Sequence, residues 1–258
     1  MKKLFKKILI GLFTLSLFLP YSSFAVTKQF QVDTGGTLTT NLNAYYKLED
    51  VNDYWSTKNL TNNGAATFIA GKVNNGVNLV RASTQYLTIA ENLGITTGSS
   101  TFAGWVQIKT QPAADTYYSL FSHSDDVNDI TNDIYYYDAA GVKKIYYHRG
   151  NKDTPAVTQT LTTDAWYFVA GVNNGTLISL YLNNSLIATS TADGTEAIAV
   201  NQFNIGREYN GSTHLPTAII DEAGVWGKGL TTTELTDLYN GGSGQTMCTV
   251  GVDCPGGV

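Results

Sequence analysis

Short segments in which apolar and polar residues alternate, separated by turns rich in Asn and Gly, restrict the fold of this chain more than any other feature. In the segment 102–109, Phe102, Val106 and Ile108 fall on one face, while Trp105 falls on the other. This period of two is typical of half-buried β-strands. About a dozen such segments follow at short spacing, which predicts an all-β fold, either an antiparallel sandwich or a barrel.

Turn residues join several of these segments in pairs. Asn173-Asn174-Gly175 separates the apolar segments 165–172 and 177–182, and Asn183-Asn184 leads into the next one. Ala140-Gly141 separates 134–138 from 144–148 in the same way. Asn and Gly tolerate the positive φ angles of tight hairpin turns, so these pairs are predicted to be β-hairpins.

A single helix is predicted near the C-terminus. Thr231 is followed three positions later by Glu234, the spacing of a capping box. Leu235, Leu238 and Tyr239 then recur at i, i+3 and i+4, which gives the helix one apolar face.

Residues 1–25 are predicted to be a secretory signal peptide. Lysines at 2, 3, 6 and 7 precede an apolar run from Ile8 to Leu19, and Ser23 and Ala25 supply the small residues of a cleavage site. The apolar run is shorter than the roughly 20 residues that a membrane-spanning helix needs, so the alternative of a membrane anchor is less favoured. The mature protein is therefore expected to be secreted, periplasmic or on the cell surface, with no membrane insertion after cleavage of the signal.

The charge of the mature chain excludes one class of partner. Four of the 16 basic residues lie in the leader, so its removal leaves 12 basic and 21 acidic residues and a net charge of −9. Binding to nucleic acid requires a basic face, and after Lys7 the longest basic run is Lys143-Lys144. No nucleic-acid partner is expected.

The mature chain divides into a lead-in of residues 26–39, one domain of residues 40–241 and a Gly-rich tail of residues 242–258. The lead-in is either an additional strand or a loose linker. Cys248 and Cys254 lie six positions apart in the tail and are predicted to form a disulfide in an oxidising compartment, with two free thiols as the alternative.

The order of the segments resembles the laminin-G-like, concanavalin-A-like jelly-roll domains of bacteria. The resemblance extends over residues 40–241 and is carried by four stretches: 44–50, 102–109, 166–184, and 205–207 with 219–239. It implies that the sandwich alternative is correct, as a two-sheet antiparallel jelly roll with one short C-terminal helix. The chain departs from the family at 78–86, which lacks the usual aspartates, and at Ala223-Gly224.

The resemblance also implies a structural Ca²⁺ ion. Its metal ligand would be Asp221, and Glu49 or Asp50 from the opening strand would join it, with backbone carbonyls completing the six to eight oxygen ligands that Ca²⁺ prefers. The alternative is that Asp221 accepts hydrogen bonds from backbone amides.

Glycan binding is the second function implied, and aromatic side chains are the candidates to carry it. Sugar rings rest their apolar faces on aromatic rings, while polar side chains bond the hydroxyl groups. The predicted ligand-binding residues are Trp105, Tyr135, Tyr137, Tyr147, His148 and Arg207. The alternative for each ring is that it packs under a loop crossing the sheet.

Catalysis is not expected. Glycoside hydrolases of this fold place two carboxylates on one strand face, whereas Asp221 and Glu222 are adjacent and point to opposite faces. The sequence therefore predicts a secreted, non-catalytic carbohydrate-binding or adhesion module, with a glycan or cell-surface polysaccharide as its partner. A structural or protein-binding surface module is the alternative, followed by a polysaccharide-degrading enzyme.

Overall fold

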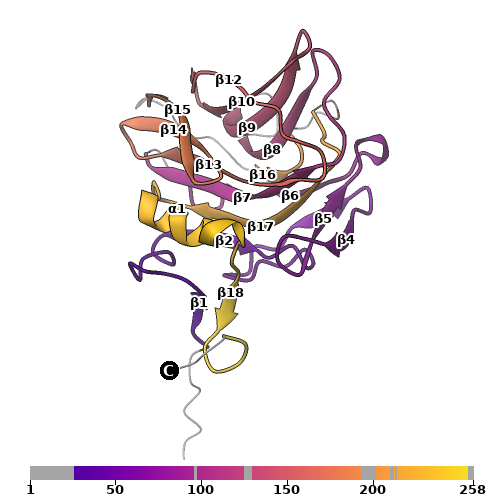
Figure 1. Ribbon diagram of the computed structural model, residues 1–258. Coiled ribbons are helices and arrows are strands. Elements are labelled where there is room, and N and C mark those ends of the chain that lie inside the picture. Colours follow the sequence, from indigo (N-terminus) through magenta and orange to yellow (C-terminus); the bar gives the residue numbers. More distant parts are fainter. Residues whose placement is uncertain are drawn as a thin grey trace, which may run out of the picture.

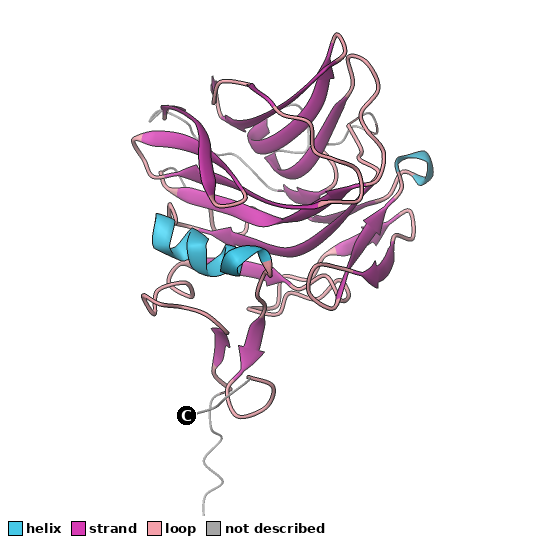
Figure 2. Cartoon of the chain, viewed as in Figure 1, coloured by secondary structure: helices cyan, strands magenta, loops and turns pink. Residues whose placement is uncertain are grey.

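The computed structural model describes residues 26–95, 98–124, 130–192, 202–209, 212 and 214–254. Two antiparallel sheets of eight strands each lie face to face, with a helix against the outer face of one of them (Figure 1). This architecture confirms the predicted β-sandwich with a short C-terminal helix (Figure 2). The predicted signal peptide, residues 1–25, lies outside the described residues.

The first sheet, called sheet I, carries the longest hairpin of the domain. Its strands in spatial order are β11 (Lys152–Asp153), β10 (Val142–Arg149), β9 (Ile130–Ala139), β8 (Tyr117–Ser124), β16 (Gln202–Ile205), β6 (Tyr86–Ile89) and β3 (Thr61–Asn63), and β12 (Val157–Thr158) also pairs with β10. The hairpin of β9 and β10 turns at Ala140-Gly141, as predicted. A short 3-10 helix, η1 (Arg81–Ser83), precedes β6.

The second sheet, called sheet II, contains β17, the strand nearest the C-terminal helix in sequence. Its strands in spatial order are β15 (Ser185–Thr191), β14 (Leu177–Leu182), β13 (Trp166–Asn173), β7 (Ser100–Ile108), β17 (Ala218–Trp226), β5 (Asn75–Leu79) and β4 (Thr67–Ala70), and β2 (Leu42–Tyr46) also pairs with β17. Here β13, β14 and β15 form the predicted consecutive hairpins.

The main hydrophobic core fills the space between the two sheets. Phe102, Val106 and Ile108 of β7 point into it, which confirms the face assigned to them from the alternation. Ile134 and Tyr136 of β9 reach the same core from sheet I. Because side chains alternate along a strand, the odd-numbered residues of β9 must point to the outer face of sheet I.

A second core lies on the outer face of sheet II, beneath helix α1 (Thr232–Tyr239). It contains Trp105, Phe168 and Trp226 from the sheet, and Leu235 and Leu238 from the helix. The predicted apolar face of the helix is therefore confirmed. The 3-10 helix η2 (Asn240–Gly242) follows directly.

Gly224 on β17 has a packing role in this second core. A Cβ atom at position 224 would lie 2.3 Å from the ring of Trp226. The glycine at position 224, one of the two departures from the family pattern here, is thus explained by the room that the Trp226 ring needs.

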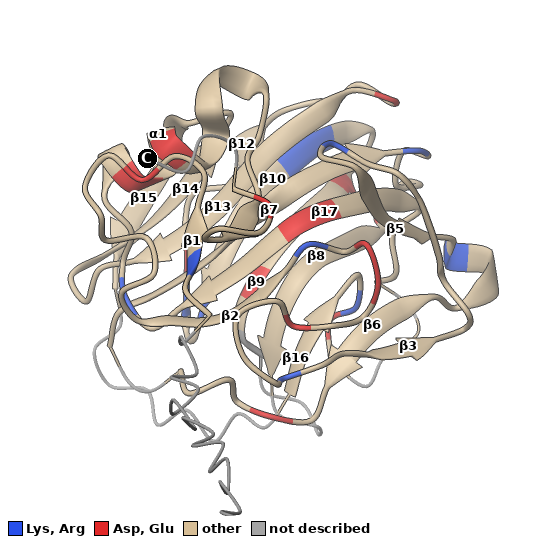
Figure 3. Ribbon diagram, turned by 90° about the horizontal axis from the view of Figure 1, so that it is seen from below, with Lys and Arg blue, Asp and Glu red and all other residues tan. Residues whose placement is uncertain are grey.

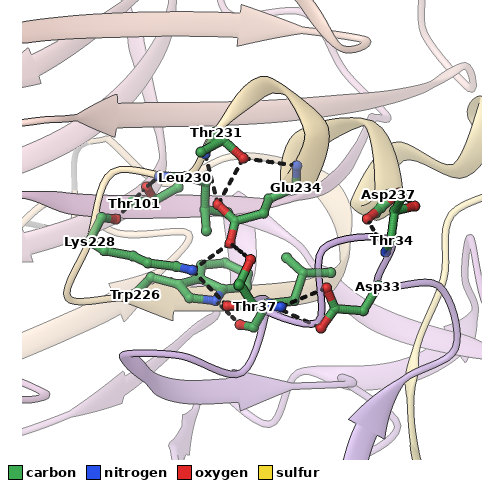
Figure 4. Close-up of polar contacts among 11 residues, drawn as sticks. Asp33, Thr34, Thr37, Thr101, Trp226, Lys228, Leu230, Thr231, Glu234 and Asp237 are labelled. Carbon is green, nitrogen blue, oxygen red and sulfur yellow. Dashed lines mark hydrogen bonds and ion pairs between the residues drawn. The ribbon is translucent and has the colours of Figure 1, made fainter.

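A network of hydrogen bonds holds the start of α1 (Figure 4). The Thr231 hydroxyl accepts from the backbone N–H of Glu234, and the Glu234 carboxylate accepts from the Thr231 N–H at 2.8 Å, which confirms the capping box. The same carboxylate accepts a hydrogen bond from the Thr37 hydroxyl at 2.7 Å and forms an ion pair with Lys228. Asp237 accepts from Thr34 at 2.7 Å. These contacts attach the lead-in to the helix.

The two ends of the described chain pair with each other below sheet II (Figure 1). Strand β1 (Lys28–Phe30) lies antiparallel to β18 (Met247–Thr249), so the lead-in contributes a strand, which was one of its two predicted forms. The predicted disulfide joins Cys248 and Cys254, whose Cα atoms are 4.9 Å apart. Met247 and Cys248 are buried, so the disulfide closes a loop next to a packed strand and not within a detached tail.

The helices among the described residues are too short or too polar to span a lipid bilayer.

Candidate functional site

The outer face of sheet I carries a group of four tyrosines, which we call the tyrosine face. Its members are Tyr117 on β8, Tyr135 and Tyr137 on β9, and Tyr146 on β10. Their chain neighbours Tyr118, Tyr136 and Tyr147 point the other way, into the main core. Strand alternation therefore separates the tyrosines of these strands into a core set and a surface set.

The four rings pack against one another in two stacked pairs. Tyr117 and Tyr137 are parallel, with ring centroids 4.7 Å apart and an interplanar angle of 4°. Tyr135 and Tyr146 stack at 5.0 Å and 22°. The two pairs meet edge to face, with angles of 82° and 84°. Offset stacking and edge-to-face contact are the favoured aromatic geometries, each worth about 0.5–1.5 kcal/mol beyond burial, so this surface is rigid.

A loop after β16 brings a carboxylate and an imidazole to the tyrosine face. The Tyr135 hydroxyl donates to Glu208 Oε1, and His214 Nδ1 contacts Glu208 Oε2. The His214 ring lies 5.4 Å from the Tyr117 ring. Asn204 donates to the backbone carbonyl of Glu208 at 2.8 Å, which holds the loop against sheet I. Glu208 itself is 7 % exposed.

The hydroxyls of Tyr135, Tyr137 and Tyr146 stay protonated near neutral pH. Burial is the main cause that raises the pKa values of Tyr135, Tyr137 and Tyr146, and neighbouring carboxylates or phenols add to it. A protonated phenol can both donate and accept a hydrogen bond. Three of the rings, those of Tyr117, Tyr137 and Tyr146, are half-buried and so retain contact with solvent.

A second carboxyl group, that of Asp133, lies beneath this surface. Asp133 is fully buried on β9 and accepts a hydrogen bond from the Ser119 hydroxyl at 2.7 Å. Burial raises its pKa well above the usual range, and the Ser119 hydrogen bond offsets only part of that shift. The uncharged form of Asp133 is therefore favoured.

The tyrosine face continues on either side into polar groups. On one side, the Arg207 guanidinium lies 4.1 Å above the Tyr86 ring and donates to Asn204 at 3.1 Å. On the other side, His148 on β10 pairs with Asp153 on β11 at 2.8 Å. Arg207 is 6 % exposed, whereas the Asp153 side chain is 58 % exposed.

Four of the six predicted ligand-binding residues lie on the outer side of sheet I. Tyr137 and His148 are half-buried there, whereas Tyr135 and Arg207 are buried, at 3 % and 6 % exposed. Tyr147 does not lie on that side, because it points into the main core and its hydroxyl donates to Asn132 at 2.7 Å. The prediction of Tyr147 as a surface ligand group is corrected: its odd position puts it on the same side as the core residue Ile145.

Trp105 is also buried, although the face assigned to it is correct. It lies on the outer side of sheet II, where Tyr239 of α1 stacks on it at 5.6 Å and 14° and Phe168 flanks it. Only 2 % of Trp105 is exposed. The prediction that it belongs to an exposed aromatic surface is therefore wrong, because the helix occupies the space where a sugar would have to lie.

The residues predicted to bind calcium have other partners. The Asp221 carboxylate accepts from the backbone N–H groups of Lys72 at 2.7 Å, Val73 at 2.8 Å and Glu222 at 2.8 Å. The Glu49 carboxylate accepts from the Asn75 N–H, at 3.2 Å for its nearer oxygen.

Asp50 accepts from the Asn52 N–H at 2.7 Å. The described residues contain no group of three His, Cys, Asp or Glu arranged to hold a metal. The contacts of Asp221 are those of the backbone-cap alternative.

Acidic side chains on β17 instead form a buried pair, seen as the red segment of that strand in Figure 3. Burial raises the pKa of Asp221 to about 8, although its three backbone hydrogen bonds oppose the shift. Burial also raises the pKa of Glu222, and the neighbouring Asp221 adds to it. The Tyr45 hydroxyl donates to Glu222. Glu222 has a φ of 49°, at the irregularity where β17 shifts register against β7.

Sequence reasoning missed several residues of the site. Alternation predicts that Tyr117 and Tyr146 point to the surface, because their chain neighbours Tyr118 and Tyr147 point into the core. Glu208 and His214 carry no such signal, because they belong to a loop without periodicity.

Comparisons with known proteins give a family and a fold. A family model described as the concanavalin A-like lectin/glucanases superfamily matches residues 81–236. No curated protein matches the chain in sequence.

Three solved structures share the fold at low identity. Domain 4 of AbnA, a GH43 extracellular arabinanase from Geobacillus stearothermophilus in complex with arabinotriose, has 18 % identity and a TM-score of 0.59, covering 76 % of this chain and 97 % of that one. The binding domain of Botulinum neurotoxin DC in complex with SialylT has 11 % identity and a TM-score of 0.61, with coverages of 79 % and 52 %.

Trypanosoma rangeli sialidase in complex with sialic acid has 14 % identity and a TM-score of 0.61. The match covers 78 % of this chain and 33 % of the sialidase. The chain thus spans about half of the toxin domain and a third of the sialidase.

Proposed function

Because the chain belongs to the concanavalin A-like lectin/glucanases superfamily, we propose that its tyrosine face binds carbohydrate without cleaving it. The observation that carries the proposal is the meeting of four packed tyrosines with Glu208 and His214 on one sheet face. Aromatic rings offer apolar contact to the C–H groups of a sugar, and fixed polar groups beside them orient its hydroxyls.

Rigid placement of these groups favours binding. The ring pairs fix the tyrosines, and the Tyr135 hydrogen bond fixes Glu208, so little side-chain freedom is lost when a ligand is bound. Two of the solved structures with this fold hold arabinotriose and sialic acid, which supports a glycan as the ligand class.

The burial of Glu208 and Asp133 supports a non-catalytic role. Glycoside hydrolysis needs two carboxyl groups that flank the scissile bond, one of them free to protonate the leaving oxygen. Asp133 is 0 % exposed beneath the rings, and both oxygens of Glu208 have protein partners. Asp133 is buried too deeply to reach a sugar above the tyrosine face.

The proposed setting is outside the cytoplasm. The N-terminal pattern of a signal peptide and the Cys248–Cys254 disulfide support secretion, periplasmic location or display on the cell surface. N-terminal sequencing of the exported protein would test this, with Val26 as the expected first residue.

The function is tested on a glycan array and by calorimetry with the best-binding glycan. We expect binding that is lost in Tyr117→Ala or Tyr137→Ala and kept in Tyr181→Ala, a half-buried tyrosine of sheet II. Circular dichroism verifies that each variant is folded.

Other results would favour the alternatives. A folded protein that binds no glycan, with or without calcium, would favour a structural or protein-binding module. Release of reducing ends from the bound polysaccharide would identify an enzyme instead.

A further inference from the structure

The charges around the tyrosine face indicate which class of glycan it accepts. Glu208 contacts Tyr135 directly, and the exposed carboxylate of Asp153 on β11 pairs with His148 of the neighbouring strand β10. Carboxylates are thus present on two sides of the aromatic surface. A ligand with its own carboxylate would meet like charges there, which costs free energy of binding.

Of the cationic side chains near this face, Arg207 is poorly placed to compensate, and the histidines His214 and His148 already face Glu208 and Asp153. Recognition of a sugar carboxylate calls for an accessible guanidinium, because its fork geometry matches the two oxygens. Arg207 is 6 % exposed, and its guanidinium is held by the Tyr86 ring and Asn204. On the described parts of β8, β9 and β10, one lysine or arginine has its side chain on this face. It is Lys144, which is half-buried on β10 opposite Tyr137.

The overall charge acts in the same direction. The whole chain carries −5, and the mature chain carries −9 if the leader is removed. A negative protein repels an acidic polysaccharide before contact, an effect that salt screens over about 10 Å at 0.1 M ionic strength.

Resting on the proposed glycan-binding function, we infer that the tyrosine face selects neutral oligosaccharides over sialylated or uronic acid glycans, with Glu208 as the specificity-determining residue. Glu208 accepts hydrogen bonds, so its carboxylate also suits the hydroxyl groups that every neutral sugar donates. The same group therefore attracts neutral sugars and repels acidic ones.

The test uses neutral glycans with acidic counterparts: lactose with sialyllactose, which adds one acidic sugar, and methyl-esterified with free galacturonan oligosaccharides, which differ only in whether the carboxyl groups are charged. We expect each bound neutral glycan to bind at least about tenfold more tightly than its acidic counterpart at low salt, a difference of roughly 1.4 kcal/mol. High salt should reduce this ratio in the wild-type protein, because the repulsion is screened.

Glu208→Gln should also reduce the ratio, mainly by improving the acidic glycan. Asp164→Asn is the matched control, since it removes the same charge from an exposed side chain that pairs with Lys109, directly after β7 of sheet II. This control should leave the ratio unchanged. The salt dependence of the wild-type protein keeps the test decisive even if Glu208→Gln fails to fold.

Two results would overturn the inference, and they are distinguishable. Equal or tighter binding of the acidic glycans, lost in Lys144→Met, would show that Lys144 accepts a sugar carboxylate and would leave the glycan-binding function intact. Absence of binding to every glycan would overturn the proposed function and this inference with it.

Discussion

The hydroxyl of Tyr135 on β9 donates a hydrogen bond to the carboxylate of Glu208, which lies 73 residues further along the chain. This contact joins a strand of sheet I to the loop that follows β16. It positions the only glutamate carboxylate that the described residues place against the tyrosine face. The site therefore depends on a long-range contact as much as on the sheet itself.

Removing that hydroxyl should weaken both the fold and the site. In Tyr135→Phe, Glu208 loses a charge-assisted hydrogen bond while it remains buried, which should cost about 1–3 kcal/mol of unfolding free energy. Urea unfolding measures this loss, and calorimetry should show weaker glycan binding. In the control Tyr167→Phe, the hydroxyl that is removed accepts a hydrogen bond from the exposed backbone N–H of Thr162. Both the unfolding free energy and the glycan affinity should therefore change little.

Trp105 should behave as a core residue. Trp105→Ala removes the β7 ring that stacks on Tyr239 of α1. We expect the unfolding free energy measured with urea to fall by about 3–5 kcal/mol. Trp166→Ala, at a half-buried tryptophan of β13, should cost less. If Trp105→Ala instead left stability unchanged and abolished glycan binding, the site would lie on sheet II.

The buried pair Asp221 and Glu222 predicts that stability falls as the pH rises. Burial raises the pKa of Asp221 from 3.8 to about 8, and it also raises that of Glu222. Between these pH values the folded state holds more protons than the unfolded state, so the unfolding free energy decreases with increasing pH. Thermal melts from pH 5 to pH 9 should show Tm falling by roughly 2–4 °C per kcal/mol lost.

Glu222→Gln should flatten this pH dependence, because it removes one titrating carboxyl and its repulsion of Asp221. Asp164→Asn, at an exposed carboxylate, should not flatten it. A Tm that rises from pH 5 to pH 9 in the wild-type protein would contradict the assignment of raised pKa values to this pair.

Calcium at Asp221, Glu49 and Asp50 stays a prediction from the family resemblance. An ion bound only to the folded state would raise Tm with increasing calcium concentration, and EDTA would reverse the rise. Asp221→Asn would then melt at the same temperature in both solutions. Identical wild-type melts in calcium chloride and EDTA would leave Asp221 with its backbone role alone.

The Cys248–Cys254 disulfide should stabilise the paired chain ends. It closes a short loop directly after buried Cys248, and the chain-entropy relation gives about 2 kcal/mol for a loop of this size. The double variant Cys248→Ser, Cys254→Ser should show this loss in urea unfolding. Mass spectrometry with and without reductant checks that the bond is present, and a mass equal to that of two free thiols would contradict the prediction.

Much of the fold was predictable because its signals are local. The alternation at Phe102, Val106 and Ile108 depends only on neighbouring residues, and the capping box at Thr231 and Glu234 spans a single helical turn. The same alternation contained the information that Tyr146 is on the surface and Tyr147 in the core. Tyr147 and His148 cannot both belong to one face, since adjacent residues of a strand point to opposite faces.

The sequence by itself determined the strands, their turns, the capped helix and the parity of each side chain, because these depend on residues close together in the chain. Only the tertiary structure decided which outer face remains open. Trp105 and Tyr137 both point away from the main core, but α1 covers Trp105 while Tyr137 stays half-buried at the surface. Alternation assigns a side chain to a face, whereas its burial depends on which distant segment packs there.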